Sequence, residues 1–136
     1  MILDKKYFEK YCVKCGKPYT DMHYKWCKPC QINHLKENFT NWTSGNEKID
    51  NFIQEIQLKI NDCYDIVFEW IPYNKFSDIN KINKYDFYTI YLAIWKDGPL
   101  CWHYQNENYG RTCKETVTLK YFHNSQNIND DFLNEV

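Results

Sequence analysis

The sequence lacks a strong net charge, a long hydrophobic run and an export signal. Its 17 lysine and arginine residues nearly balance 18 aspartate and glutamate residues, and the net charge of -1 argues against a general polyanion binder. No apolar run is long enough to span a membrane, and the first ten residues carry too many charges for a signal peptide. We therefore expect an intracellular protein, cytoplasmic or nuclear, with no membrane partner.

The composition is that of a folded chain with little material for a core. Of the 136 residues, 43% are hydrophobic and 18% are aromatic, and this content of aromatic residues argues against disorder. A chain of this length buries only about two-thirds of its unfolded surface. It can therefore form one modest core or two small ones, and small cores need additional support.

The seven cysteines do not form a disulfide pattern. Their odd number and the missing export signal indicate that most are reduced or metal-bound. Two C-x-x-C motifs, Cys12-Val-Lys-Cys15 and Cys27-Lys-Pro-Cys30, are separated by eleven residues. Paired thiolates of this kind complete a tetrahedral sulfur shell around Zn²⁺ and leave no position open for water. We predict a structural zinc site with ligands Cys12, Cys15, Cys27 and Cys30; the alternative is a set of buried or free thiols.

The residues around these motifs fit a small zinc-binding module over residues 1–39. Gly16 permits the tight turn that points backbone N–H groups at sulfur, and a helix is expected over residues 31–39. The pattern is typical of a treble-clef or ribbon site in which the helix start supplies two ligands. His34 is an alternative ligand, but His23 and His34 fit surface positions better because four cysteines already complete the shell.

Lysines and aromatic residues alternate in this module, as they do in proteins that bind single-stranded nucleic acid. Eight lysines oppose three acidic residues over residues 1–36, and a zinc ion on four thiolates leaves a balance of about +3. A tiny aromatic core around the metal explains the pattern more simply, so we expect no nucleic-acid partner. The other cysteines, Cys63, Cys101 and Cys113, are expected to behave as ordinary small hydrophobic residues.

An amphipathic helix is predicted within residues 40–63, after a polar hinge. Ser44 followed by Glu47 fits a capping box that starts this helix. Large apolar residues then repeat at helical spacing, namely Ile49, Phe52, Ile53, Ile56 and Ile60. We expect this stripe to pack on the sheet that follows, because an exposed stripe of large residues favours aggregation.

Residues 64–136 have strand patterns followed by a helix. Runs rich in β-branched and aromatic residues predict four strands, at residues 65–71, 76–82, 88–95 and 115–122. Asp97-Gly-Pro99 ends the third of these strands, and the next stretch, residues 100–114, is predicted to be a loop whose aromatic residues lie back over the sheet. Ser125 can cap a final helix that carries Glu135.

Lys120 lies in the last predicted strand, and Glu135 lies in the helix that follows it. This order resembles the amino-terminal lobe of protein kinases, in which a strand lysine and a helix glutamate form an ion pair that holds the lysine on nucleotide phosphates. Val117-Thr-Leu-Lys120 is similar to the V-A-I-K strand of kinases, and Phe132-Leu-Asn-Glu135 is similar to the end of the kinase αC helix. The same pair can equally be a structural tie between strand and helix.

Two further stretches carry the resemblance. Residues 87–95 are similar to the second strand of tyrosine-kinase-like kinases, with Ile90 in place of the valine that closes the glycine loop. A cysteine-rich start before Asn41-Trp-Thr-Ser-Gly45 resembles the expanded kinase-like proteins of mycorrhizal fungi.

The glycine-rich loop of kinases is degenerate in this sequence. The three glycines of G-x-G-x-x-G-x-V fall on Asn83, Tyr85 and Tyr88, whose side chains prevent close approach of the backbone to phosphate. Ile90 and Lys120 complete the residues that would contact a nucleotide. We therefore expect weak or absent binding of ATP and Mg²⁺.

The residues and the resemblance together predict an α+β fold. It would consist of a zinc ribbon or treble-clef-like module, a helix, and the antiparallel sheet of a partial kinase amino-terminal lobe that ends on αC. The catalytic-loop and D-F-G aspartates of kinases lie beyond this sequence, so we expect no phosphotransfer from this chain alone. The favoured hypothesis is a non-catalytic, pseudokinase-like module that binds a protein partner. The alternatives are the front end of an active ATP-dependent protein kinase truncated at Val136, and a zinc-dependent adaptor.

Overall fold

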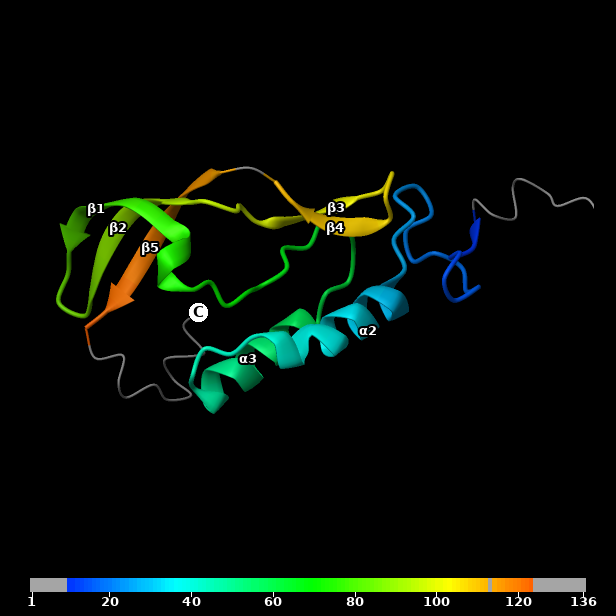
Figure 1. The fold of residues 1–136 in the computed structure, drawn as a ribbon, viewed down its shortest axis with the longest axis horizontal. Coiled ribbons are helices and arrows are strands. Elements are labelled where there is room, and N and C mark those ends of the chain that lie inside the picture. The colour runs from blue at the N-terminus through cyan, green and yellow to red at the C-terminus, as the bar shows by residue number, and fades with distance from the viewer. Residues whose placement is uncertain (1–9, 113, 124–136) are drawn as a thin grey trace, which may run out of the picture. The chain divides into compact units, whose positions relative to one another are not determined.

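A computed structural model describes residues 10–112 and 114–123 of the chain (Figure 1). Helices and antiparallel strands are both present, so the predicted α+β class is confirmed. Among the described residues, no helix has the length and apolar character needed to cross a membrane. The predicted final helix, with Ser125 and Glu135, and the single residue Cys113 lie outside the described residues.

The chain divides into two compact units. Unit 1 consists of Met1–Trp70 and Pro99–Thr112, and unit 2 consists of Ile71–Gly98 and Cys113–Val136. The ranges 1–39, 40–63 and 64–136 stay a prediction, and a segment from the carboxyl-terminal half of the sequence belongs to unit 1.

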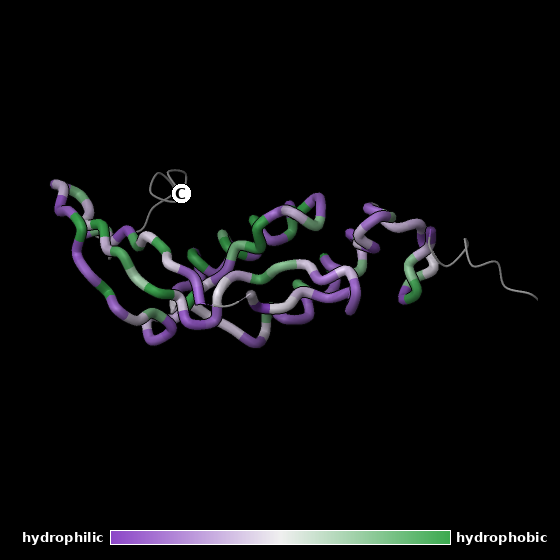
Figure 2. The backbone as a smooth tube through the Cα atoms, turned by 90° about the horizontal axis from the view of Figure 1, so that it is seen from above, coloured by the Kyte–Doolittle hydropathy of each residue, from purple (hydrophilic) through white to green (hydrophobic). Residues whose placement is uncertain are grey.

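Unit 1 contains the helices α2 (Lys28–Asn38) and α3 (Glu47–Gln57), with the short 3₁₀ helix η1 (Phe39–Asn41) after α2. Both predicted helices are therefore present, and α2 begins three residues before its predicted start at residue 31. Hydrophobic and hydrophilic residues alternate along the backbone of the chain (Figure 2), and in α3 the apolar residues lie on one side, with Ile53 buried.

The start of α3 differs from the predicted capping box. Asn46 is the N-cap residue, and its side-chain oxygen accepts hydrogen bonds from the backbone N–H groups of Lys48 and Ile49 at 2.9 and 3.2 Å. The Ser44 hydroxyl instead donates to the carboxylate of Asp50 at 2.5 Å. An asparagine next to the first helical turn therefore performs the role that was predicted for the serine.

The prediction of a loop at residues 100–114 was wrong, because this stretch contains a β-hairpin. Strands β3 (Leu100–His103) and β4 (Asn108–Arg111) form a two-stranded antiparallel sheet in which Trp102 pairs with Tyr109. Glu107, in the turn, has a left-handed backbone with φ of 50°. The hairpin places two large aromatic side chains on neighbouring strands.

The core of unit 1 combines residues near the cysteine motifs, the helix α2, the segment after α3 and this hairpin. Its buried residues are Trp26, Leu35, Ile60, Cys63 and Val67. The indole N–H of Trp26 donates to the hydroxyl of Tyr109 at 2.9 Å, and the indole N–H of Trp102 donates to the backbone oxygen of Tyr24 at 2.7 Å. The aromatic residues of the hairpin therefore pack on the core of unit 1 and satisfy its buried polar groups.

Residues 65–71, predicted as a strand, do not form one. The segment is held by side chains instead of by a ladder of backbone bonds. Gln57 donates through its side-chain amide to the backbone oxygen of Phe68 at 2.7 Å, and the Phe52 ring packs edge-to-face on the Phe68 ring. The guanidinium of Arg111 donates two hydrogen bonds, of 2.6 and 2.7 Å, to the carboxylate of Glu69. The stripe on α3 thus has a partner within unit 1.

Unit 2 contains a three-stranded antiparallel sheet in the order β1–β2–β5 (Figure 1). Its strands are β1 (Phe76–Lys84), β2 (Tyr88–Trp95) and β5 (Glu115–Phe122), preceded by the 3₁₀ turn η2 (Tyr73–Lys75). The strands β2 and β5 have their predicted bounds, and their register runs without a break. The strand β1 pairs with β2 through two irregularities, in agreement with its imperfect hydrophobic alternation.

Candidate metal centre

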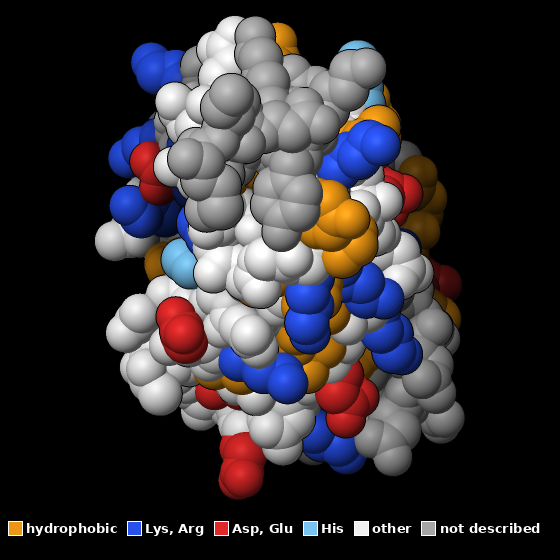
Figure 3. Space-filling view, turned by 90° about the vertical axis from the view of Figure 1, so that its right-hand side faces the viewer, with side chains coloured by type: hydrophobic (Ala, Val, Ile, Leu, Met, Phe, Trp, Pro, Cys, Tyr) orange, Lys and Arg blue, Asp and Glu red, His pale blue; other side chains and the backbone are white. Residues whose placement is uncertain are grey.

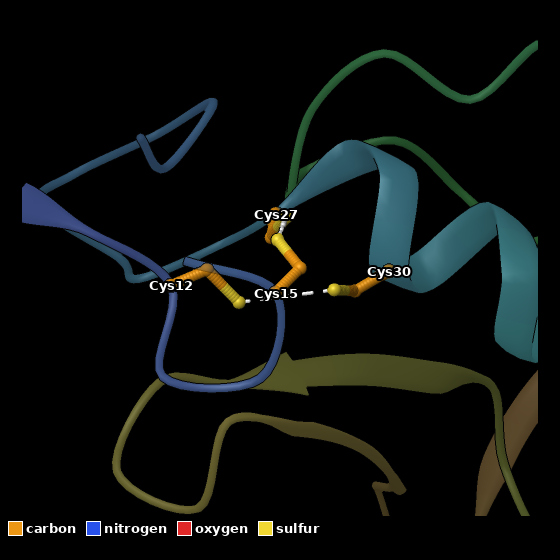
Figure 4. Close-up of side chains that lie close together, drawn as sticks. All are labelled: Cys12, Cys15, Cys27 and Cys30. Carbon is orange, nitrogen blue, oxygen red and sulfur yellow. Dashed lines mark hydrogen bonds between the residues drawn. The ribbon is translucent and has the colours of Figure 1, made fainter. Parts of the chain in front are cut away.

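Four cysteine side chains meet at one place in unit 1. Their sulfur atoms all lie within 4.8 Å of one another. Cys12 and Cys15 come from the loop before α2, whereas Cys27 and Cys30 come from the start of that helix (Figure 4). The structure therefore brings the two motifs that were identified from their spacing into one cluster.

Local backbone structure sets the positions of both cysteine pairs. In the first pair, the backbone N–H of Gly16 donates to the oxygen of Cys12 at 2.8 Å, and Gly16 has a φ of 74° that favours glycine. In the second pair, Cys27 is the N-cap residue of α2, and its backbone oxygen accepts from Gln31 at 3.0 Å. A tight turn and a helix start therefore present the two pairs of thiols.

The distances between the sulfur atoms fit a tetrahedral metal site. Cys12 and Cys30 are 3.8 Å apart, and Cys15 and Cys27 are 3.6 Å apart, measured between their sulfur atoms. A tetrahedron with zinc–sulfur bonds of about 2.3 Å has edges of about 3.8 Å. These two sulfur pairs share no atom, so they are opposite edges of the tetrahedron. The cluster is compatible with a structural metal ion bound by four sulfur atoms.

The thiols of this cluster differ in how readily they ionise. A hydrogen bond from the backbone N–H of Lys17 lowers the pKa of the exposed Cys15 thiol to about 7. Burial raises the pKa of the Cys27 and Cys30 thiols. Metal binding requires thiolates, so a bound cation would supply the charge that offsets this burial.

The β3–β4 hairpin forms one side of the cluster. The hydroxyl of Tyr19 donates to the carboxylate of Glu107, 88 residues further along the chain. Burial, and to a smaller extent this hydrogen bond, raises the pKa of Tyr19. Glu107 and Trp102 line a small pocket together with Cys12 and Cys27. Sequence reasoning missed both hairpin residues because no local pattern relates them to the cysteines.

The other candidate ligands lie away from the cluster or are exposed. His23 and His34 are exposed, and neither belongs to the group of four cysteines that could hold a metal ion. Cys63 is buried in the core, as predicted, with its thiol 3.8 Å from the carboxylate of Asp21. Cys101 is exposed and lies outside the cluster.

The residues predicted to contact a nucleotide gather at one end of the sheet in unit 2. Ile90 pairs with Asn83 on one side and with Lys120 on the other. The Asn83 amide donates to the Tyr85 hydroxyl at 3.1 Å, and the rings of Tyr85 and Tyr88 are 5.0 Å apart. The ammonium group of Lys120 lies 4.1 Å from the centre of the Tyr88 ring. The lysine is thus engaged by an aromatic ring of the neighbouring strand.

The metal-binding interpretation rests on geometry within this chain. The kinase-like relationship rests on the sequence resemblance alone and stays a prediction. No protein-family model, curated protein or solved structure matches the chain.

Proposed function

We propose that this chain is a zinc-stabilised, non-catalytic protein-binding module in which four cysteines hold one structural Zn²⁺. The observation that carries the proposal is the pair of opposite sulfur–sulfur distances, 3.8 and 3.6 Å, which match the edges of a zinc–sulfur tetrahedron. Four protein thiolates fill the coordination shell, so no position is left for a reacting water molecule. The ion therefore acts on stability rather than on chemistry.

The size of the core explains why an ion is needed. The core cluster of unit 1 has five buried residues, and a core of that size gives little stability without a cross-link. An ion in the cluster would join the loop of Cys12 and Cys15 to the start of α2. Its binding free energy would then contribute directly to folding.

Metal analysis tests the zinc site. The purified full chain should contain about one zinc per chain, and replacement by Co²⁺ should give the absorption bands of tetrahedral thiolate coordination. Cys27→Ser should lose the metal and unfold at lower temperature. Cys101→Ser is the matched control, because Cys101 is an exposed cysteine outside the cluster, and it should keep the metal. Bound zinc that is unchanged in Cys27→Ser would exclude this site.

We also propose that the non-catalytic role derives from a kinase-like lobe. The antiparallel order β1–β2–β5 and the pairing of Lys120 with Ile90 support this relationship. The contact between Lys120 and the Tyr88 ring supports weakened nucleotide binding, because the ammonium group would have to leave the ring face to hold a phosphate. The side chains of Asn83 and Tyr85 also fill loop positions where kinases have glycine.

A thermal-shift titration with Mg-ATP separates this proposal from an active kinase. The proposal predicts no saturable stabilisation of the full chain by millimolar nucleotide. An active kinase front end predicts stabilisation that disappears in Lys120→Met, and a coding sequence that continues beyond Val136 into H-R-D and D-F-G motifs. Saturable binding that depends on Lys120 would therefore replace the first interpretation by the second.

The exposed apolar residues of the cysteine module favour a zinc-dependent adaptor as a second candidate. Val13, inside the first C-x-x-C motif, is 63% exposed, and Met22 is 54% exposed. An adaptor that works through this surface should lose partner capture in Val13→Asp while its zinc content stays the same. Capture that survives both Val13→Asp and the zinc-free variant Cys27→Ser would exclude the adaptor.

A further inference from the structure

Exposed tyrosines gather on unit 1 outside the cysteine cluster. Figure 3 shows a face of the molecule on which hydrophobic side chains lie exposed among lysine and arginine side chains. In unit 1, the side chain of Tyr64 is 70% exposed and that of Tyr104 is 48% exposed. They come from segments far apart in the sequence, yet both rings contact the ring of Tyr24. Exposed aromatic residues that gather from distant segments form a candidate interaction surface.

The Tyr24 ring meets each of the other two rings edge-to-face and nearly at a right angle, an arrangement that is compatible with adjacent sides of a box. Tyr24 and Tyr64 have centroids 5.1 Å apart and planes at 77°, and Tyr24 and Tyr104 have centroids 6.2 Å apart and planes at 73°. Elsewhere in the chain, the Lys120 ammonium lies 4.1 Å from the Tyr88 centroid. Two perpendicular rings at 4.1 Å from one shared cation have centroids about 5.8 Å apart, by right-triangle geometry. The two measured separations bracket this value.

Carboxylates lie beside these rings. Asp21 accepts a hydrogen bond from the backbone N–H of Tyr24 at 3.0 Å, and Asp62 accepts one from that of Tyr64 at 2.7 Å. A hydrogen bond with Tyr24 raises the pKa of Tyr64 to about 12, and the charge of Asp21 acts in the same direction. Within residues 10–112 and 114–123, neither carboxylate forms an ion pair, and Lys28 donates to an asparagine side chain instead. These two carboxylates supply negative charge near the rings, next to Lys25 and to the His23 ring that contacts Tyr24.

We propose that Tyr24, Tyr64 and Tyr104 form an aromatic cage that binds a quaternary or methylated ammonium group. Ring faces attract cations, and a methylated ammonium loses less hydration on entering the cage than the strongly hydrated ammonium of lysine. This chemistry has two sources, the trimethyl-lysine side chain of another protein and a choline group. The cage uses none of the four cysteines, so it is a site separate from the zinc cluster of the proposed function.

Calorimetric titration of the full chain tests the cage. Tetramethylammonium, choline and a peptide with trimethyl-lysine should each bind saturably, and the methylated peptide should bind at least about tenfold more tightly than its unmethylated form. A peptide with a neutral tert-butyl group of the same shape should also bind about tenfold more weakly. Tighter binding of the trimethyl-lysine peptide than of choline identifies a protein source, and the reverse identifies a choline compound.

Matched variants locate the binding to these rings. Tyr64→Ala and Tyr104→Ala should each weaken binding at least about tenfold, whereas Tyr64→Phe keeps the ring and should stay within about threefold. Tyr73→Ala, at a 75% exposed tyrosine of unit 2, should leave binding unchanged. Circular dichroism and zinc content establish that each variant is folded. Equal binding of the methylated, unmethylated and tert-butyl peptides, or unchanged binding by folded Tyr64→Ala, would overturn the proposal.

Discussion

The hydrogen bond between Trp26 and Tyr109 provides a direct test of how unit 1 is built. Trp26 is buried, with 0% exposure, and its indole N–H donates to the Tyr109 hydroxyl at 2.9 Å across 83 residues of sequence. We predict that Trp26→Phe and Tyr109→Phe each destabilise the protein. We also predict that the two effects are not additive, because both substitutions remove the same bond.

The magnitudes follow from what each substitution leaves behind. Tyr109→Phe leaves a buried indole N–H without an acceptor, which costs about 1–3 kcal/mol. Trp26→Phe removes the donor and also opens space in the core, so it should cost about 2–4 kcal/mol. In the double variant the unsatisfied donor is gone, and its free energy of unfolding should exceed the additive expectation by about 1–2 kcal/mol.

Urea unfolding followed by circular dichroism, with Zn²⁺ in excess, measures these free energies. Tyr73→Phe changes a 75% exposed tyrosine of unit 2 and should stay within about 0.5 kcal/mol of the unmodified protein. If the changes in the free energy of unfolding add to within about 0.3 kcal/mol, the hydrogen bond between the indole and Tyr109 does not form in solution. The proposed construction of unit 1 would then fail.

Three further predictions rest on single groups. Asn46→Ala should cost about 1 kcal/mol in urea titrations, because it removes the cap of α3. The control Asn51→Ala, at an exposed site on the same helix, should change stability by less than half as much. Arg111→Lys should cost about 1 kcal/mol, because lysine cannot make both hydrogen bonds to Glu69, and this cost should shrink in a Glu69→Gln background. Burial raises the pKa of Tyr109 from 10.0 to about 12, so its contribution to stability is complete below pH 10 and is lost as the pH rises towards 12. Tyr109→Phe should flatten that part of the stability curve, and an unchanged slope would contradict the assignment.

Local sequence patterns were sufficient for elements whose stability is visible in their own residues. The strands β2 and β5 have runs of β-branched and aromatic residues bounded by turn residues, and their predicted bounds match the structure. The helix α3 repeats apolar residues at helical spacing, so its presence was predicted, although its cap was assigned to the wrong residue. Cap residues of similar chemistry lay within two positions of each other, and only the backbone conformation decides between them.

The failures share one physical cause, which is dependence on distant partners. The hairpin β3–β4 has few local strand signals, and its aromatic residues are stabilised by contact with the core of unit 1. Residues 65–71 show the opposite error, because their composition is typical of a strand but they form none. The side chain of Val67, for example, is buried in the core instead.

In the candidate metal site, too, the local pattern was predicted and the long-range contact was not. The spacing of the two C-x-x-C motifs was enough to identify all four cysteines of the cluster. The hydrogen bond from Tyr19 to Glu107 joins positions 88 residues apart, so no spacing rule could have found it.

The way the hairpin is inserted limits how the cysteine cluster can be transferred between proteins. The polypeptide passes from one unit to the other three times, at residues 70–71, 98–99 and 112–113. A fragment that stops at Trp70 would keep every cysteine of the cluster but would lose the indole of Trp102 and the hydroxyl of Tyr109. A single cut in the chain therefore cannot separate unit 1 with all of its residues. A fragment that carries the cysteine cluster into another protein needs the hairpin attached through a new linker.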